Sequence, residues 1–319
     1  MMSEKQLPAS PLDEPEVSPE PGWLPIREVA RQTGVNPVTL RAWERRYGLI
    51  LPRRTPKGHR LYNDAHVARI HAVLAWLNRG VAVGQVRELL DREPPSDAEA
   101  APDSPWQVLQ TELLAATEAL ASRRLDGLFD QAGSLYPAPL LCERLLQPLL
   151  AELERRERAG AGLERAFFLS WLRTRLAARV QQHNRQSGGA PLLLAGLGGP
   201  PLEPGLWLCA WLATATGSPL EVLDGPVSLT ELELALPRLA PRALLLHAAQ
   251  PLTAAQLRQL GRLAHGSTLP LLLAGPAAAV QREALASLPG LLLAEDPPAA
   301  LQALQNLPAR APEEPPCAS

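Results

Sequence analysis

The stretch that decides the fold of the N-terminal part is residues 36–48, which read NPVTLRAWERRYG. Asn36 predicts a helix N-cap, because its side-chain oxygen can accept a hydrogen bond from the free N–H groups of the first turn. Pro37 fits the first helical position, where a missing N–H costs nothing. Gly48 predicts the end of the helix, because glycine adopts the left-handed conformation required there.

Another helix is predicted just before this one, over residues 26–33, and Gly34 ends it. The tight turn from Gly34 to Asn36 joins the two helices, as in a helix-turn-helix unit. On the second helix Leu40, Trp43 and Tyr47 share an apolar face. The polar side chains of this helix lie mostly on its other faces, where they can reach phosphates and base edges of DNA. They are Thr39, Arg41, Arg45 and Arg46.

The segment that follows, residues 52–62, reads PRRTPKGHRLY and is a second basic element. Its cations, Arg53, Arg54, Lys57 and Arg60, fall within eight residues. Proline and glycine at positions 56 and 58 supply turn residues at the tip. We expect the apolar pieces at 50–51 and 61–62 to pair as a two-stranded wing beside the helix.

The charge distribution favours nucleic acid as the partner of this segment. Residues 23–92 contain 13 Lys and Arg against five Asp and Glu, a net charge of +8, whereas the whole chain carries −2. The remainder of the chain therefore carries −10. A basic island on an acidic protein is typical of nucleic-acid binding. The alternative is a solvated basic surface, and the two helices with a wing in register favour DNA.

Residues 39–48 and 52–62 together resemble the winged-helix domain of the MerR family of transcription regulators. Within that family the chain is similar to the cobalamin-dependent photoreceptor repressors and to their cofactor-free, curli-activating relatives. Trp43 fits either the core, which its spacing favours, or the sugar-phosphate backbone. Glu44 is expected to orient a neighbouring arginine by an ion pair rather than to read a cytosine. The DNA-binding residues that we predict on this basis are Thr39, Arg41, Arg45, Arg46, Arg53, Arg54, Lys57, His59, Arg60 and Tyr62.

The composition predicts a multidomain protein of the cytoplasm. The chain has 319 residues, 34 of them proline, and its apolar runs are far shorter than a membrane span. Residues 1–22 have no apolar signal core and predict a disordered tail. The three cysteines are widely separated and form neither a metal pattern nor a disulfide framework. We therefore expect no membrane partner.

Changes of pattern along the chain predict the domain boundaries. Residues 23–91 form the winged-helix DNA-binding domain, which ends with helices over 64–78, capped by Asp64, and 83–90. Residues 92–105 are a polar, proline-rich linker. Residues 106–187 predict a bundle of four helices, in which an aromatic stripe is expected to be core. Residues 308–319 form a second proline-rich tail.

Residues 188–307 predict an α/β domain. Short apolar runs over 191–195, 220–223, 243–247, 269–274 and 291–294 are typical of buried parallel strands. Helices are predicted over 203–215, 228–239, 253–265, 277–288 and 298–307. Five βα units imply an open, doubly wound, flavodoxin-like sheet. The predicted fold class is therefore multidomain, α and α/β.

This order of domains resembles the cobalamin-binding regulators along the whole chain, but the ligand residues differ. In that family the bundle carries a Trp and a Glu-His pair over the corrin, and a loop after the first strand carries the cobalt-binding His. Arg155, Arg165 and Ala166 stand at the bundle positions, and Leu202 stands at the loop His. Leucine and alanine have no lone pair for cobalt. We therefore expect no cobalamin, no other cofactor and no metal.

Other candidate sites carry less weight. His247 lies at the carboxyl end of a predicted strand, where ligands bind such sheets, and is either a substitute ligand or a structural residue. Residues 196–199 faintly resemble a dinucleotide loop, but prolines follow them. No histidine after residue 106 has an acidic or cysteine partner at motif spacing. The sequence predicts no catalytic site and no enzyme.

We therefore predict a bacterial transcription regulator that binds operator repeats in promoter DNA as a dimer or tetramer, without cobalamin. The alternative is a light- or small-molecule-responsive regulator that uses the α/β pocket as its sensor. A corrinoid-type enzyme or carrier with an added DNA module is a third possibility. The expected partners are double-stranded DNA, further copies of the chain, and RNA polymerase or a partner regulator.

Overall fold

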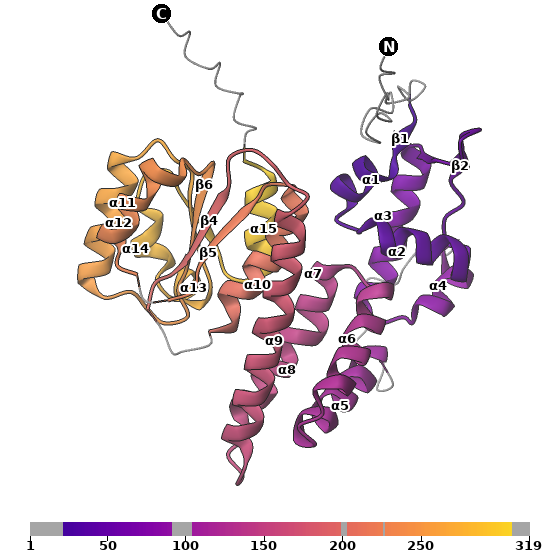
Figure 1. The fold of residues 1–319 in the computed structure, drawn as a ribbon, viewed down its shortest axis with the longest axis horizontal. Coiled ribbons are helices and arrows are strands. Elements are labelled where there is room, and N and C mark those ends of the chain that lie inside the picture. Colours follow the sequence, from indigo (N-terminus) through magenta and orange to yellow (C-terminus); the bar gives the residue numbers. More distant parts are fainter. Residues whose placement is uncertain (1–21, 91–103, 199–202, 226, 308–319) are drawn as a thin grey trace, which may run out of the picture.

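The computed structural model describes residues 22–90, 104–198, 203–225 and 227–307 (Figure 1). The predicted tails, 1–22 and 308–319, and the predicted linker, 92–105, lie almost wholly outside the described residues. Leu202 also lies outside them. Among the described residues, no helix is long and apolar enough to cross a membrane.

The N-terminal part is a small winged helix. Its elements are β1 (Leu24–Pro25), α1 (Ile26–Thr33), α2 (Pro37–Ala42), η1 (Trp43–Tyr47), β2 (Arg53–Arg54), β3 (Arg60–Tyr62), α3 (Asp64–Asn78) and α4 (Val83–Leu89). The π-helical turn η1 continues α2 without a break, so the two form the predicted second helix. The N-cap of α3 is Asn63 and not Asp64, since Asn63 and His66 exchange hydrogen bonds as a capping box.

A helical bundle follows. It contains α5 (Pro105–Glu118), α6 (Ser122–Leu135), the consecutive segments α7 (Ala138–Leu141), η2 (Cys142–Leu146) and α8 (Gln147–Arg155), and the long α9 (Ala161–Asn184). Because α7, η2 and α8 are continuous, the bundle has the four helical rods that the sequence predicts. The stripe of Phe168 and Trp171 on α9 is buried, as expected for core.

The C-terminal part alternates strands and helices. The strands are β4 (Leu192–Gly196), β5 (Leu220–Leu223), β6 (Ala243–His247), β7 (Leu271–Ala274) and β8 (Leu291–Ala294). The helices are α10 (Pro204–Ala213), η3 (Thr214–Thr216), α11 (Leu229–Leu239), α12 (Ala254–Gly266), α13 (Pro276–Val280), α14 (Arg282–Ala286) and α15 (Pro297–Gln305). All strands are parallel, in the order β5-β4-β6-β7-β8, which is the flavodoxin-like order. This confirms the predicted fold class.

Alternate side chains of each strand serve two different cores. Leu192, Leu194 and Leu245 pack with the side of the sheet that α10 and α15 cover, whereas Leu193 and Leu244 pack with α11 and α12 on the other (Figure 1). Because both faces are covered, the strands read as continuous apolar runs.

The predicted helix over 277–288 is wrong in one respect, because it breaks into α13 and α14. The break lies at Gln281, whose backbone leaves the helical conformation at φ −110° and ψ 23°. Its side-chain amide accepts from the Leu252 N–H at 2.6 Å and donates to the Leu252 carbonyl at 2.9 Å. These two bonds satisfy the backbone N–H and carbonyl of Leu252 in a neighbouring loop. Local sequence signals do not reveal a contact between segments so far apart in the chain.

The winged helix packs on the bundle through apolar contacts, and hydrogen bonds among these contacts join the two parts. The indole N–H of Trp43, where α2 passes into η1, donates to the carbonyl of Leu135 at the end of α6 over 2.9 Å. Arg144 donates to the Asn78 side chain at 2.9 Å, and Trp106 donates to the Leu77 carbonyl at 3.4 Å. The structure therefore ties both the recognition helix and α3 to the bundle.

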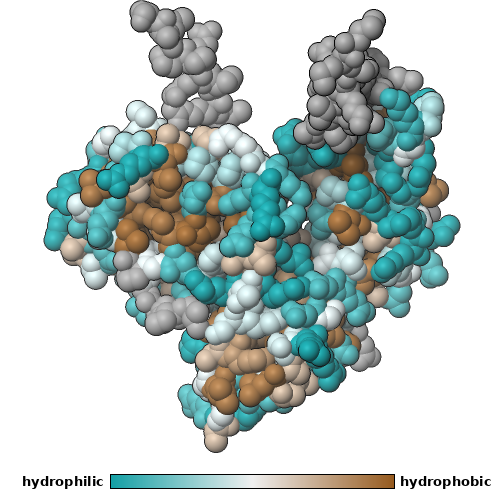
Figure 2. Space-filling model, in the orientation of Figure 1, coloured by the Kyte–Doolittle hydropathy of each residue, from teal (hydrophilic) through white to brown (hydrophobic). Residues whose placement is uncertain are grey.

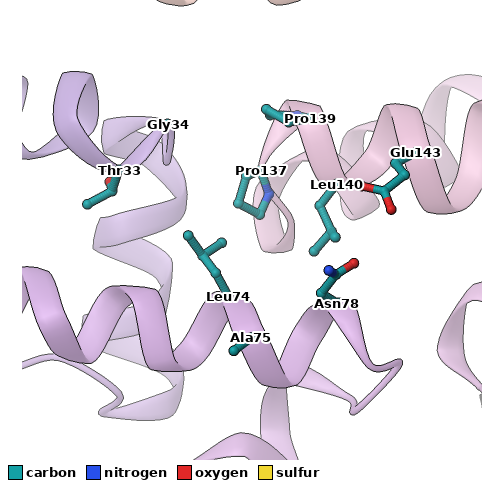
Figure 3. A pocket seen from close by; sticks show the side chains of 9 residues that line it. All are labelled: Thr33, Gly34, Leu74, Ala75, Asn78, Pro137, Pro139, Leu140 and Glu143. Atoms are coloured by element: carbon teal, nitrogen blue, oxygen red, sulfur yellow. The ribbon is translucent and has the colours of Figure 1, made fainter. Parts of the chain in front are cut away.

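A cavity of about 260 Å³ lies along this seam (Figure 3). Thr33 and Gly34 of the helix-turn-helix turn and Leu74 and Asn78 of α3 face Leu140 and its neighbours at the start of α7. The bundle thus approaches the turn without filling the space behind it.

One apolar core runs through all three parts. Buried residues of the winged helix, of the bundle and of one face of the sheet form a single cluster, because α9 packs on α10 and α6 packs on α2. In Figure 2 hydrophilic side chains cover most of the winged helix, whereas apolar side chains gather over the lower part of the bundle. The winged helix is therefore packed onto the rest of the molecule, and the face of it that Figure 2 shows is mostly polar.

Replacing Trp43 with phenylalanine tests the docking bond. Phe keeps an aromatic ring but has no N–H, so the Leu135 carbonyl loses its donor and the core loses volume. We expect the free energy of unfolding to fall by about 1–3 kcal/mol, measured as a lower midpoint of urea unfolding. Val38→Ala, on the exposed face of the same helix, is the control. An unchanged midpoint in Trp43→Phe would contradict this role.

Candidate nucleic-acid interface

The recognition helix begins and ends as the sequence predicts. The Asn36 side chain accepts a hydrogen bond from the Thr39 N–H at 2.9 Å, and Pro37 occupies the first turn. Gly34 and Gly48 have φ angles of +70° and +60°, the left-handed conformation that ends α1 and η1. The helix-turn-helix is therefore fixed by local capping.

The recognition helix has a buried apolar face and an exposed basic face. Leu40 and Trp43 are buried in the core, which confirms the core alternative for Trp43. On the other face Arg41, Arg45 and Arg46 are exposed. These guanidinium groups are therefore free of the core and available to an external partner.

The first strand of the wing begins three residues later than predicted. Residues 50–51 are not a strand, because Ile50 is buried and the carbonyls of Leu49 and Leu51 are bonded by Arg69 at 2.5 Å and by His66 at 3.0 Å. Instead, β2 pairs with β3 in the register Arg53↔Leu61 and Arg54↔Arg60, and β1 adds a third strand. Tertiary contacts thus keep residues 49–51 out of the wing.

The tip of the wing is a tight turn that carries basic side chains. The Gly58 N–H donates to the Thr55 carbonyl at 2.8 Å, and the glycine has a φ of +84°. Lys57 and His59 are exposed at this tip, and Arg53 and Arg54 are exposed on β2. Most of the predicted wing cations therefore face solvent.

Trp23 contributes to the wing in a way that sequence reasoning missed. The Arg53 guanidinium lies over its indole ring, 5.3 Å from the ring centroid. A cation over an aromatic face is attracted by the ring quadrupole, so this contact restrains Arg53. Local sequence patterns do not reveal this contact, because it is the pairing of β1 with β3 that brings Trp23 to the wing.

Glu44 connects the recognition helix to the wing. Its carboxylate accepts from Arg54 Nη2 at 2.7 Å and from Arg60 Nε through its other oxygen. The predicted ion pair of Glu44 with an arginine is confirmed, and both partners lie on the wing. Arg60 is consequently half-buried rather than displayed.

Two predicted DNA-contacting residues lie in the interior. Thr39 and Tyr62 are 0% and 1% exposed, and their hydroxyl oxygens have no hydrogen-bond partner among the described residues. Burial raises the pKa of Tyr62 to about 12. We therefore correct the set and leave both out of the interface, because a buried side chain cannot reach a phosphate or a base edge.

The α/β part has a second feature of interest, at the carboxyl ends of β4 and β6. Such an end is where open α/β sheets bind ligands. His247, at the end of β6, is 3% exposed, and its Nδ1 has no partner among the described residues. A Cβ at Gly205 would overlap the imidazole, and one at Gly275 would lie 2.9 Å from its Nε2. The imidazole therefore fills the space between these two glycines.

Comparison with known proteins identifies the chain. Residues 24–93 match the family described as MerR HTH family regulatory protein. The HTH-type transcriptional regulator MlrA of Salmonella typhimurium (strain SL1344) is 34% identical over 206 residues, which cover 64% of this chain and 80% of that protein. The chain belongs to the MerR family of helix-turn-helix regulators. The resemblance predicted from residues 39–62 is thereby confirmed.

Two further similarities extend the comparison. The HTH-type transcriptional repressor CarH of Myxococcus xanthus is 32% identical to this MerR-family chain over 143 residues, 42% of this chain and 48% of that protein. The solved structure of a monomethylamine corrinoid protein from Methanosarcina barkeri is similar with a TM-score of 0.47 and 14% identity, covering 62% of this chain and 98% of that one.

Three of the family's cofactor positions lie in the described residues of this MerR-family structure, on α8 and α9. Ala166 is exposed on α9, where it offers only a methyl group. Arg155 donates to Glu152 at 2.7 Å, and Arg165 pairs with Glu154. Leu202 lies outside the described residues. Among those described, no group of three or more His, Cys, Asp or Glu residues could hold a metal ion.

His247 should make the stability of this regulator depend on pH. Burial lowers the pKa of His247 to about 4, whereas an unfolded histidine titrates near pH 6.5. Between these values the unfolded state binds a proton that the folded state does not. The contribution of His247 to the free energy of unfolding should therefore be fully present above about pH 6.5. As the pH falls toward 4, the free energy of unfolding should decrease by about 3 kcal/mol in total.

The measurement is urea unfolding across this pH window for the wild type, His247→Asn and, as control, His59→Asn at the exposed wing tip. His247→Asn should remove this part of the slope, and His59→Asn should keep it. Equal slopes in wild type and His247→Asn would show that the buried imidazole is not its source.

Proposed function

We propose that this MerR-family regulator binds operator repeats in promoter double-stranded DNA as a dimer or higher oligomer and thereby controls transcription. The observation that carries the proposal is the exposure of basic side chains on both the recognition helix and the wing. These are Arg41, Arg45, Arg46, Arg53, Arg54, Lys57 and His59, which we call the basic surface. The chain outside residues 23–92 carries a net charge of −10, so the cations are concentrated on this domain.

The two parts of the basic surface suit different parts of a duplex. A helix enters the major groove, where an arginine can donate two hydrogen bonds to one guanine. Arg41 and Arg45 are one helical turn apart on the exposed side of that helix. The wing places Arg53, Arg54 and Lys57 on a hairpin beside the helix, where phosphates can be neutralised.

One winged helix reads one half-site, so specific binding calls for more than one copy of the chain. A dimer would occupy two half-sites, and a tetramer would occupy more. In the cytoplasm, RNA polymerase or a partner regulator is the further contact through which bound protein would change transcription. The role is regulatory and not enzymatic.

We propose that regulation proceeds without cobalamin. Ala166 has no lone pair for a metal, and His247 fills the space at the sheet edge between Gly205 and Gly275. The alternative function, a light- or small-molecule-responsive regulator, is favoured by one observation: the buried Nδ1 of His247 has no partner among the described residues. A ligand with a hydrogen-bond donor would satisfy it.

Alanine substitution of Arg41 and Arg45 tests the interface. Each substitution should weaken binding to a selected operator by about 1–3 kcal/mol, because each removes a base or phosphate contact. The measurement is fluorescence anisotropy with full-length protein at fixed salt. The matched control is Arg31→Ala, an exposed arginine on α1 that pairs with Glu28. Wild-type affinity in both Arg41→Ala and Arg45→Ala would disprove the assigned interface.

A thermal-shift and absorbance titration with adenosylcobalamin, in the dark and after illumination, tests the absence of the cofactor. A ligand that binds only the folded state must raise the melting temperature. We expect no shift and no bound chromophore. A clear shift would overturn the cofactor-free proposal and make His247 the first residue to replace, with His247→Asn and Ala166→Leu as the two variants to compare.

A further inference from the structure

The register of the wing creates an electrostatic conflict. Arg54 on β2 lies directly opposite Arg60 on β3. Like charges directly opposite each other destabilise an antiparallel pair. A wing with this register therefore needs a nearby negative charge to hold both guanidinium groups in place.

Glu44 supplies that charge from outside the wing. It belongs to η1, the last turn of the recognition helix, and its two oxygens accept from different strands: Oε1 from Arg54 Nη2 at 2.7 Å and Oε2 from Arg60 Nε. Two bonds to two strands restrain the hairpin more tightly than one bond would, because the hairpin cannot rotate about a single contact.

The three side chains differ in how far they are shielded from water. The side chain of Glu44 is 11% exposed, that of Arg60 is 16% exposed and that of Arg54 is 51% exposed. Burial alone would raise the pKa of Glu44, but hydrogen bonds from Arg60 and Arg54 hold that pKa below its usual value. The carboxylate therefore stays ionised, and of the two arginines only Arg54 keeps much of its surface free.

We propose that Glu44 is a positioning residue that sets the angle between the recognition helix and the wing. Arg60 is its anchor and not a DNA-contacting side chain, whereas Arg54 carries the outward charge. This inference rests on the proposed function, since it explains how one half-site is read by helix and wing together. It also assigns a role to Arg60 that differs from the DNA contact predicted from the sequence.

Simple electrostatics predicts the opposite outcome when Glu44 is neutralised. A carboxylate beside a basic surface repels phosphates, so removing it should tighten binding to any duplex. If Glu44 positions the wing, its removal should weaken binding to the operator while binding to an unrelated duplex stays equal or becomes tighter. The ratio of the two affinities separates the two accounts.

The experiment compares full-length wild type, Glu44→Gln and Glu28→Gln. Glutamine keeps the shape of glutamate, but its single side-chain oxygen is a weaker, uncharged acceptor for the two guanidinium groups. Glu28→Gln is the matched control, because it removes the same charge and Glu28 also pairs with an arginine, but that arginine, Arg31, belongs to α1 and not to the wing. Anisotropy titrations with the selected operator and with an unrelated duplex are run over a series of salt concentrations.

For Glu44→Gln we expect operator affinity to fall by about tenfold, with no loss of affinity for the unrelated duplex. For Glu28→Gln both affinities should stay within about twofold of wild type, because surface ion pairs contribute little. A parallel gain of both affinities in Glu44→Gln would overturn the positioning role. If wild type itself shows no preference for any operator, it is the proposed function that fails.

A second pair of variants keeps the inference testable if Glu44→Gln loses stability. Arg60→Gln and the double variant Glu44→Gln/Arg60→Gln complete a double-mutant cycle with thermal unfolding as a parallel readout. If Arg60 acts only through Glu44, the double variant binds the operator no more weakly than the weaker single variant. Additive losses would show that Arg60 contacts DNA by itself and would overturn its role as an anchor.

Discussion

The structure depends most on the burial of Trp43, the first residue of η1 in the recognition helix. Its ring fills the core of the winged helix, and its indole N–H donates to the Leu135 carbonyl of the bundle. One side chain thus orients the helix against its own domain and joins that domain to the next. Because the apolar face is fixed inward, Arg41 and Arg45 are held outward, and the basic surface follows from the packing rather than from charge alone.

The other parts of the molecule extend this arrangement. The core that begins at Trp43 continues through α9 into α10 and one face of the sheet, so the three parts are in continuous contact. At the far end of this path, at the carboxyl ends of β4 and β6, His247 fills the space between Gly205 and Gly275. A change of packing at that edge would therefore have an unbroken apolar route toward the recognition helix, although such coupling requires two discrete arrangements.

The sequence predicts those features that depend on local signals. Asn36, Pro37 and Gly48 set the limits of the recognition helix through capping, which involves neighbouring residues only. The strands were predictable because a sheet covered on both faces has uniformly apolar strands. Features that involve distant contacts were missed. His66 and Arg69 bond to the carbonyls of Leu51 and Leu49 and keep that segment out of the wing, and Gln281 bonds to Leu252 where the predicted helix breaks. Thr39 and Tyr62 have hydroxyl groups that could bind DNA, but only the packing of the fold shows that they are buried.

The measurement that tests the central claim most directly is selection from a pool of randomised duplexes with the full-length protein, followed by hydroxyl-radical footprinting of the retained sequences. If the basic surface reads DNA, the pool converges on a sequence with repeated half-sites. Each half-site then shows protection where the helix enters the major groove and beside it where the wing lies. A pool that stays random after several rounds, with no protected positions, would contradict the account.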